Sequence, residues 1–559
     1  MTRPIDVLVI GGGVAGLVAA RECAQVGLAV TIIETTDVVG GPVAGHVLDG
    51  LTLDSGAESF AVRGGTVASF IEDLGLTDQV VAPNVAGAWL HLPALATGST
   101  SRASATKIAT RQALARPSTD AAMSVPLPKA GVLGIPGSPL ADDVRRVIGW
   151  KGALRAYADR LMPVLTIGRE HSLGDLVKKR MGQRVLDRLV EPVASGVYTT
   201  SAVDLEIDVV APGLNRALTT AGSLSGAVSA LRAGAPAGSN VGGLLGGMAS
   251  LPAAIVAALQ RHDVAILTGT TATALARSGT DDAPTWSVTV TRQADAAPTD
   301  PAAPTGPAAP ADAGAPTGPA APLARPTDRT PTVSTAPAAE RTTSTLTARY
   351  LIIATQGAQA LRLVNPLGDQ FDALAELDWP APTAVTLTTL VLDEPALDAH
   401  PRGTGVLVSA DAPDVTAKAL THVTAKWAWV AEAAGPGRHV VRLSYGRAGQ
   451  PNPTDDLSDT ELQALALHDA SALLGVPLAA AAVRAFARTE WRDALSPATL
   501  GAPERAQQVR EAVAATPAME ITGAWLAGTG LASVIPHALE AGDRIRHAAL
   551  GLTITGPDE

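Results

Sequence analysis

The chain has 559 residues, of which 47% are hydrophobic and 17% charged, and its net charge is −11 at pH 7. These values predict a globular protein of about two to four folding units and disfavour a nucleic-acid binder, which would carry a basic domain or stripe. The one cysteine, Cys23, rules out an intrachain disulfide. The chain opens without the pattern of a secretory signal and has no apolar run of about 18 residues, so we expect a cytoplasmic protein that contacts the inner face of a membrane at most peripherally.

The first 34 residues have the pattern of a strand, a glycine turn, a helix and a second strand. Val7–Ile10 is a continuous apolar run, as in a parallel strand that is covered on both faces. Val14–Val26 has helical spacing and ends before Gly27, a residue type that commonly terminates helices. Between them Gly11–Gly16 fits Gly-x-Gly-x-x-Gly, and Glu34 ends the second strand. This context predicts a dinucleotide-binding βαβ unit.

Each residue of this fingerprint has a physical role in the predicted site. Gly11 permits the tight turn, Gly13 lets the backbone approach a pyrophosphate, and Gly16 lets helix and strand pack closely. The helix N-terminus offers free N–H groups and the positive end of its dipole to the phosphates. Glu34 can accept hydrogen bonds from ribose hydroxyls and disfavours a cofactor with a 2′-phosphate.

The middle of the chain divides into helical, low-complexity and strand patterns. Residues 142–165 and 173–194 have helical spacing, and Ser172 to Asp175 has a capping-box pattern. Residues 294–337 repeat the octet Ala-Pro-Thr-Gly-Pro-Ala-Ala-Pro, a composition that cannot offset its ordering entropy. Because strand patterns flank it, at 286–291 and 349–354, we predict a loop expanded between two strands. The remaining strand patterns are at 385–391, 405–408 and 439–444, and a shorter polar insert lies near 98–122.

The two ends of the chain are predicted to build the nucleotide fold together. Residues 524–531 are interpreted as a strand running into a glycine turn, followed by a helix from His537. The dipole of a helix that follows Gly528–Pro536 would favour the negative charge of a reduced flavin.

Two further segments distinguish FAD from NAD. Gly40-Gly41 and Asp54–Phe60 resemble the Gly-Gly turn and the Asp-x-Gly segment that run past the ribityl chain and ring in flavoproteins of the amine-oxidase type. Pro42 stands where that family often has arginine or lysine, so no side-chain contact with the phosphates is expected there. Because no cysteine lies in the C-terminal half, a cysteinyl-flavin bond is excluded and we expect non-covalent FAD.

Three longer stretches are similar to the protoporphyrinogen and coproporphyrinogen III oxidases. They are Pro126–Pro136, Ser172–Gly182 with its continuation Leu189–Tyr198, and Leu244–Pro252. After Trp491 the family usually has Pro-Gln-Tyr and then Gly-His; here Ala498, Thr499 and Ala502 depart from that pattern, so contacts made by the glutamine, tyrosine or histidine are not carried over.

The resemblance implies an α/β fold (α+β overall) with a Rossmann-like FAD domain assembled from both chain ends, a mixed-sheet substrate domain and a helical lobe. The expected FAD-binding domain comprises 1–80, 239–293, 341–360 and 515–559. The substrate-binding domain comprises 81–93, 123–140 and 361–514, and the helical lobe 141–238. Two low-complexity inserts, 95–122 and 294–340, complete the chain.

The resemblance also implies site residues. Positions that match the family's FAD contacts are Gly11, Gly12, Gly13, Val14, Ala15, Gly16, Glu34, Gly41, Gly56, Ala57, Glu58, Ser59, Ala272, Trp491, Thr529, Gly530 and Leu531. Carboxylates of the substrate need cations, for which Arg63, Lys418, Lys426 and Arg442 are candidates, and Val406 could pack on the macrocycle. No catalytic side chain and no metal site is predicted, because the flavin carries the difficult chemistry.

The implied reaction is an oxygen-dependent, six-electron oxidation in haem biosynthesis, with hydride passing to flavin N5 and hydrogen peroxide released. The absence of an evident membrane-buried stretch favours coproporphyrinogen III, with four carboxylates, over protoporphyrinogen IX, with two. An alanine-rich composition typical of actinobacteria, which tend to use the coproporphyrin route, favours the same choice. The alternatives are protoporphyrinogen IX oxidation, a flavin amine oxidase, and a non-catalytic flavin-binding partner of the next haem enzyme, which is itself a candidate protein partner.

Overall fold

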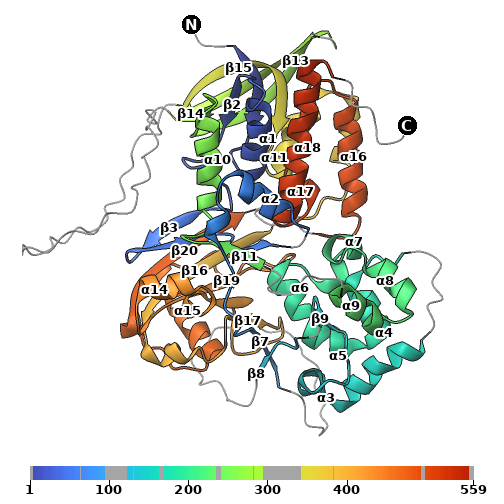
Figure 1. The fold of residues 1–559 in the computed structure, drawn as a ribbon, viewed down its shortest axis with the longest axis vertical. Coiled ribbons are helices and arrows are strands. Elements are labelled where there is room, and N and C mark those ends of the chain that lie inside the picture. Colours follow the sequence, from blue (N-terminus) through green and yellow to red (C-terminus); the bar gives the residue numbers. More distant parts are fainter. Residues whose placement is uncertain are drawn as a thin grey trace, which may run out of the picture.

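The computed structural model describes residues 4–62, 64–94, 122–129, 131–162, 169–233, 241–280, 283–293, 341–381, 383–492 and 498–552. Arg63, all but the last residue of the first predicted insert and the whole of the second lie outside these ranges. The chain forms three units around a common junction (Figure 1). One contains both termini, a second contains most of the strands after residue 383, and the third is helical.

The first unit is built on a seven-stranded sheet of order β12-β2-β1-β15-β14-β13, with β21 paired to β15. Pairing is parallel among β12, β2, β1, β15 and β21 and antiparallel in the β13-β14-β15 meander. Val7 to Val9 are 0% exposed, as the continuous apolar run predicts for a strand covered on both faces. The strands are β1 (Ile5–Ile10), β2 (Val30–Ile33), β12 (Ala265–Leu267), β13 (Thr270–Thr280), β14 (Ala283–Gln293), β15 (Arg341–Ile353) and β21 (Met519–Ile521).

Helices cover both faces of this sheet. On one face, α1 (Val14–Ala24), α10 (Ser250–Gln260) and α18 (Leu531–Leu550) pack on Val7 and Val9. On the other, α11 (Gly357–Val364), α12 (Asp369–Ala375) and α16 (Ala502–Ala514) pack on Leu8 and Ile10. The predicted domain boundary is therefore wrong for α12 and α16, which fall within 361–514 but bury their apolar residues against the first sheet and not the second.

The second sheet has the order β20-β16-β19-β18-β17-β7-β8. Helix α15 (Asp459–Leu474) covers one face, and its Leu462 and Leu473 share a core with Leu443 of β19. This sheet collects strands from distant parts of the chain, since β7 pairs in parallel with β17. The strands are β7 (Ala88–Pro93), β8 (Ala122–Pro126), β16 (Ala384–Asp393), β17 (Gly405–Val408), β18 (Ala419–His422), β19 (Arg438–Tyr445) and β20 (Val483–Arg492).

The helical unit, which we call the helical lobe, contains α3 (Asp142–Tyr157), α4 (Leu173–Met181), α5 (Gln183–Val185), α6 (Glu191–Val197), α8 (Leu214–Ala221) and α9 (Leu224–Ala233). Ser172 caps α4 as predicted, because its hydroxyl accepts a hydrogen bond from the Asp175 N–H at 3.1 Å. Arg180 pairs with Asp159 at 2.7 Å inside the lobe. None of the helices in the described ranges has both the length and the apolar character needed to cross a bilayer.

Two sequence predictions about the C-terminal region are wrong. Residues 524–527 form a short helix, α17 (Ala524–Ala527), and the strand lies earlier, at β21. Gly523 and Gly528, with φ of +139° and +97°, bound that short helix, whereas the apolar run suggested a strand. Helix α18 begins at Leu531 and not at His537, because Pro536 lies inside the helix and not before it.

Candidate functional site

The glycine fingerprint folds as a tight turn into α1. Gly11 has a φ of +109°, and a Cβ on Gly16 would lie 1.9 Å from the Gly11 carbonyl oxygen, so both positions require glycine. Gly13 precedes Val14 and Ala15 as the N-cap residue, and a Cβ on Gly13 would meet no protein atom within 4 Å. The N-terminus of α1, whose first N–H groups have no acceptor within the helix, therefore faces open space at Gly13, which fits the pyrophosphate of a dinucleotide.

Glu34 is held at the end of β2 with its carboxylate turned back towards the glycine turn. It accepts hydrogen bonds from the Gly12 N–H at 2.7 Å and from the Thr36 N–H at 2.8 Å. Its backbone carbonyl accepts from the Thr270 N–H at 2.8 Å, which ties it to β13, where Ala272 is buried two residues further on. This arrangement fixes the carboxylate in the position that the sequence assigns to the ribose.

The Gly-Gly turn and the Asp54–Ser59 segment join the fingerprint at the same place. The Gly40 N–H donates to the Gly12 carbonyl at 2.8 Å, and a Cβ on Gly41 would lie 3.5 Å from the Gly13 Cα. The Ala57 N–H donates to the Pro42 carbonyl at 2.8 Å. A Cβ on Gly56 would lie 1.9 Å from that same oxygen, so glycine is required there. Three separate predicted cofactor segments thus form one continuous backbone surface.

The second sheet holds the Asp54–Ser59 segment through two side chains. Arg442 of β19 donates from Nη1 to the carbonyls of Asp54 at 3.1 Å and Gly56 at 2.9 Å. Trp491 of β20 donates from Nε1 to the Ser55 carbonyl at 2.8 Å. The sequence did not predict that either side chain binds this segment, because only the register of β16, β19 and β20 brings both to it.

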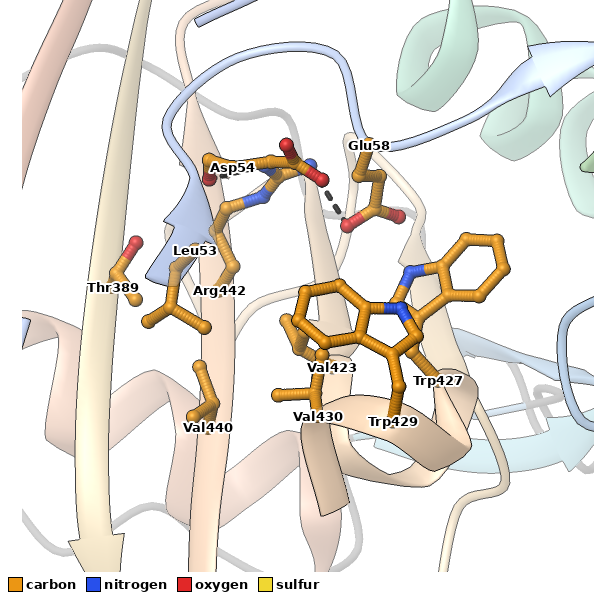
Figure 2. A pocket seen from close by; sticks show the side chains of 10 residues that line it. All are labelled: Leu53, Asp54, Glu58, Thr389, Val423, Trp427, Trp429, Val430, Val440 and Arg442. Carbon is orange, nitrogen blue, oxygen red and sulfur yellow. Dashed lines mark hydrogen bonds and ion pairs between the residues drawn. The ribbon is translucent and has the colours of Figure 1, made fainter. Parts of the chain in front are cut away.

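Two carboxyl groups of this segment, those of Asp54 and Glu58, have opposite pKa shifts and line a small cavity together with Trp427 and Trp429 (Figure 2). Burial raises the pKa of Glu58, but Lys426 at 2.5 Å and Arg442 at 2.9 Å outweigh burial and lower it to about 2. Burial raises the pKa of Asp54 to about 6, although the Met248 N–H donates to its Oδ1 at 2.7 Å. At neutral pH Glu58 is therefore firmly ionised, whereas Asp54 is close to its titration point.

These contacts change the expected roles of the substrate candidates. Lys426 and Arg442 are both ion-paired with Glu58, so each already has a carboxylate partner within the protein. Val406 is 1% exposed in the core of the second sheet, where core packing accounts for it. Lys418 is also buried, against the helical lobe, and Arg63 lies outside the described residues.

The C-terminal glycine turn places a second helix N-terminus at the same end of the fold. Thr529 and Gly530, whose φ is +99°, precede Leu531, the first residue of α18. Helices α1 and α18 run in the same direction, because Ala19 packs against Gly542 and Glu22 pairs further along with Arg546 at 3.5 Å. Cys23 is 0% exposed between the two helices. Within the described ranges, no cluster of histidine, cysteine or carboxylate side chains has the arrangement of a metal site.

Comparison with known proteins gives the family. The model for flavin-containing amine oxidoreductases matches residues 14–338 and 327–545. The chain is 26% identical over 207 residues to the coproporphyrinogen III oxidase of Propionibacterium freudenreichii, a match that covers 37% of this chain and 34% of the relative. It is 22% identical over 541 residues to the coproporphyrinogen III oxidase of Bacillus subtilis, covering 95% of each chain.

A crystal structure from Exiguobacterium sp. 255-15, provisionally assigned as a protoporphyrinogen oxidase, superimposes with a TM-score of 0.70 at 22% identity. It covers 98% of this chain and 99% of that one, and so shares the whole fold. The predicted fold class, cofactor and oxidoreductase class are confirmed by these matches. The chain belongs to the family of flavin-containing amine oxidoreductases, and its cofactor is FAD.

Proposed function

We propose that this protein is an oxygen-dependent oxidase that converts coproporphyrinogen III to coproporphyrin III in haem biosynthesis. The observation that carries the proposal is the alignment with the Bacillus subtilis enzyme over 95% of both chains, which includes the FAD unit, the second sheet and the helical lobe alike. The chain spans about a third of the length of the first curated relative it matches, so the long alignment is the stronger support.

The bound FAD would supply a hydride acceptor and would pass electron pairs to oxygen, giving one hydrogen peroxide for each pair. The protein's part is to bind and orient the reactants. The N-terminus of α1 directs N–H groups at the pyrophosphate, and Glu34 accepts hydrogen bonds from the ribose. The N-terminus of α18, at Thr529 to Leu531, favours negative charge on the reduced ring system.

The second sheet has a positioning role in this proposal. Arg442 and Trp491 hold the backbone of Asp54 to Gly56, part of the Asp54–Ser59 segment that we call the flavin segment, against this sheet. These direct bonds would keep the backbone beside the flavin rigid against the second sheet. Such positioning is a major source of rate enhancement when the cofactor supplies the chemistry.

The test compares coproporphyrinogen III and protoporphyrinogen IX, each prepared anaerobically and then aerated with the enzyme while porphyrin fluorescence is followed. We expect the higher kcat/KM for coproporphyrinogen III, with peroxide released in step. A preference for protoporphyrinogen IX would reassign the substrate. Turnover of methylamine or a polyamine, with neither porphyrinogen oxidised, would make the protein an amine oxidase.

A bound flavin without any porphyrinogen-dependent peroxide would instead indicate a non-catalytic partner of the next haem enzyme. The proposal places the protein in the cytoplasm, with contact at most at the inner face of the membrane. Sedimentation of the protein with vesicles checks that placement.

A further inference from the structure

Lys418 and Arg447 bring two positive charges to the contact between the helical lobe and the second sheet. Lys418 directly precedes β18 and is 2% exposed, and Arg447 follows β19. Across the contact, Thr199 follows α6 and has a φ of +65°. Its carbonyl accepts from the Ala448 N–H at 2.7 Å, and its hydroxyl accepts from Lys418 Nζ at 2.8 Å. The two basic side chains are thus fixed at a junction between two structural units.

These charges have no carboxylate partner among the described residues. The only hydrogen-bond partner of Lys418 Nζ there is the neutral Thr199 hydroxyl, and Nε and Nη2 of Arg447 are buried without an acceptor. Glu191 is close enough to influence Arg447, but its carboxylate already accepts from the Ala202 N–H at 2.9 Å. Burial and the nearby Arg447 lower the pKa of Lys418 to about 7.

Burying cations without a counter-ion is unfavourable for folding. The presence of Lys418 and Arg447 at this contact therefore calls for a reason other than stability. The contrast with Lys426 is direct, because that lysine is paired with Glu58. The segment that carries Thr199 also carries the buried hydroxyls of Ser195 and Thr200, which have no partner either. Side chains that can donate hydrogen bonds therefore gather here near one carboxylate, that of Glu191, which forms no ion pair with either cation among the described residues.

We propose that Lys418 and Arg447 form a binding site for a carboxylate of the substrate at the contact between the helical lobe and the second sheet. This inference rests on the proposed function, because a porphyrinogen supplies the carboxylate. The unpaired N–H groups of Arg447 and the ammonium of Lys418 would make charge-assisted hydrogen bonds to it.

The position of the pair beyond the end of β19 suits such a substrate. Arg442, on β19, holds the flavin segment, and Arg447 follows five residues later, just after the strand ends. At about 3.3 Å per residue, the backbone between them extends at most about 16 Å. A tetrapyrrole lying along this strand would keep its ring near the flavin while one side chain on its rim reaches the cation pair.

The experiment measures binding to the FAD-loaded enzyme by porphyrin fluorescence, using coproporphyrin III and its tetramethyl ester as probes. The variants are Lys418→Met and Arg447→Met, with the exposed Lys151→Met as the matched control. We expect each of the two variants to bind the acid about 10-fold more weakly, the range for one lost bond to a charged group. The ester should bind wild type and all variants equally.

Equal binding of the acid by wild type and both variants would overturn the site. So would an equal loss of acid and ester binding, because that indicates structural damage. A melting temperature that is unchanged or higher in the methionine variants supports the site, since these cations do not stabilise the fold.

Turnover separates this inference from the proposed function. If the wild type oxidises coproporphyrinogen III, Lys418→Met should raise KM with little change in kcat. If the wild type oxidises no porphyrinogen while the variants still lose binding of the acid alone, the proposed function fails and the carboxylate site stands. If the wild type oxidises coproporphyrinogen III and the variants bind the acid as tightly as the wild type does, the carboxylate site is refuted and the proposed function stands.

Discussion

Arg442 and Glu58 form an ion pair of 2.9 Å that joins the second sheet to the flavin segment, with the two side chains 11% and 12% exposed. The same guanidinium holds the carbonyls of Asp54 and Gly56. Lys426 pairs with the other oxygen of Glu58, so one carboxylate contacts two cations. The Glu58 carboxylate therefore helps to hold the flavin segment against the second sheet.

Glu58→Gln should destabilise the folded protein by about 3 kcal/mol, because it leaves two largely buried cations without a counter-ion. Urea unfolding at pH 7 measures the loss, and flavin absorbance should show weaker FAD retention. Glu490→Gln is the control, since Glu490 pairs with Arg488 at a more exposed site and should cost less than about 1 kcal/mol. Equal losses of unfolding free energy in the two variants would contradict the role of Glu58 as a buried counter-ion for Lys426 and Arg442.

The destabilisation caused by Glu58→Gln should depend on pH. The pKa of Glu58 in the folded state, about 2, lies below its ordinary value of 4.5. Its contribution to stability is therefore fully present above pH 4.5 and is lost as the pH falls from 4.5 towards 2. The difference in unfolding free energy between wild type and Glu58→Gln should stay constant from pH 8 to about 5.5 and shrink below pH 4.5. A difference that grows on acidification would refute this assignment.

The effect of Asp54→Asn on stability should have the opposite pH dependence. The pKa of Asp54 is raised from 3.8 to about 6, so the folded state binds its proton more tightly than the unfolded state does. Its favourable contribution is present below about pH 4 and is lost as the pH rises through 6. Asparagine should therefore raise the melting temperature more at pH 8 than at pH 4.5, measured by differential scanning fluorimetry. A larger gain at pH 4.5 would be the wrong sign.

Gly13→Leu should give a folded protein without FAD. A side chain on Gly13 points into space that holds no protein atom within 4 Å, so it would occupy the cofactor's place without a clash in the protein. Gly16→Ala is the counterpart, because its Cβ would lie 1.9 Å from the Gly11 oxygen and should destabilise the fold itself. Circular dichroism and flavin absorbance distinguish the two outcomes. A yellow, active Gly13→Leu protein would rule out the pyrophosphate assignment.

Deletion of 303–337 should leave flavin content and turnover intact. That segment lies outside the described residues, but Gln293 of β14 pairs directly with Arg341 of β15, so the strand ends that it connects are already adjacent. A shorter connection can therefore close the same hairpin. Flavin content per chain and the porphyrinogen assay check the result, and loss of FAD would show that the segment has a structural role.

The sequence alone determined the local features of the FAD unit, because they depend on short-range stereochemistry. One βαβ unit contains the continuous apolar run of β1, the glycines at 11 and 16 and the acid at Glu34. The local conformation of each can be predicted from the residue type and its position in that unit. Strands were also correctly predicted on either side of the long insert, although β15 begins at Arg341, eight residues before the predicted start.

Only the tertiary structure decided how charged side chains are used. Lys418, Lys426 and Arg442 look equivalent as candidates for binding carboxylates, because sequence spacing does not reveal which cation meets an acid from a distant segment. The fold brings Glu58 to Lys426 and Arg442, across more than 360 residues. Among the described residues, the hydrogen-bond partner that it gives Lys418 is a neutral threonine. Strand register and the packing of the helical lobe make that distinction, and both are set by the burial of apolar surface, not by the charges themselves.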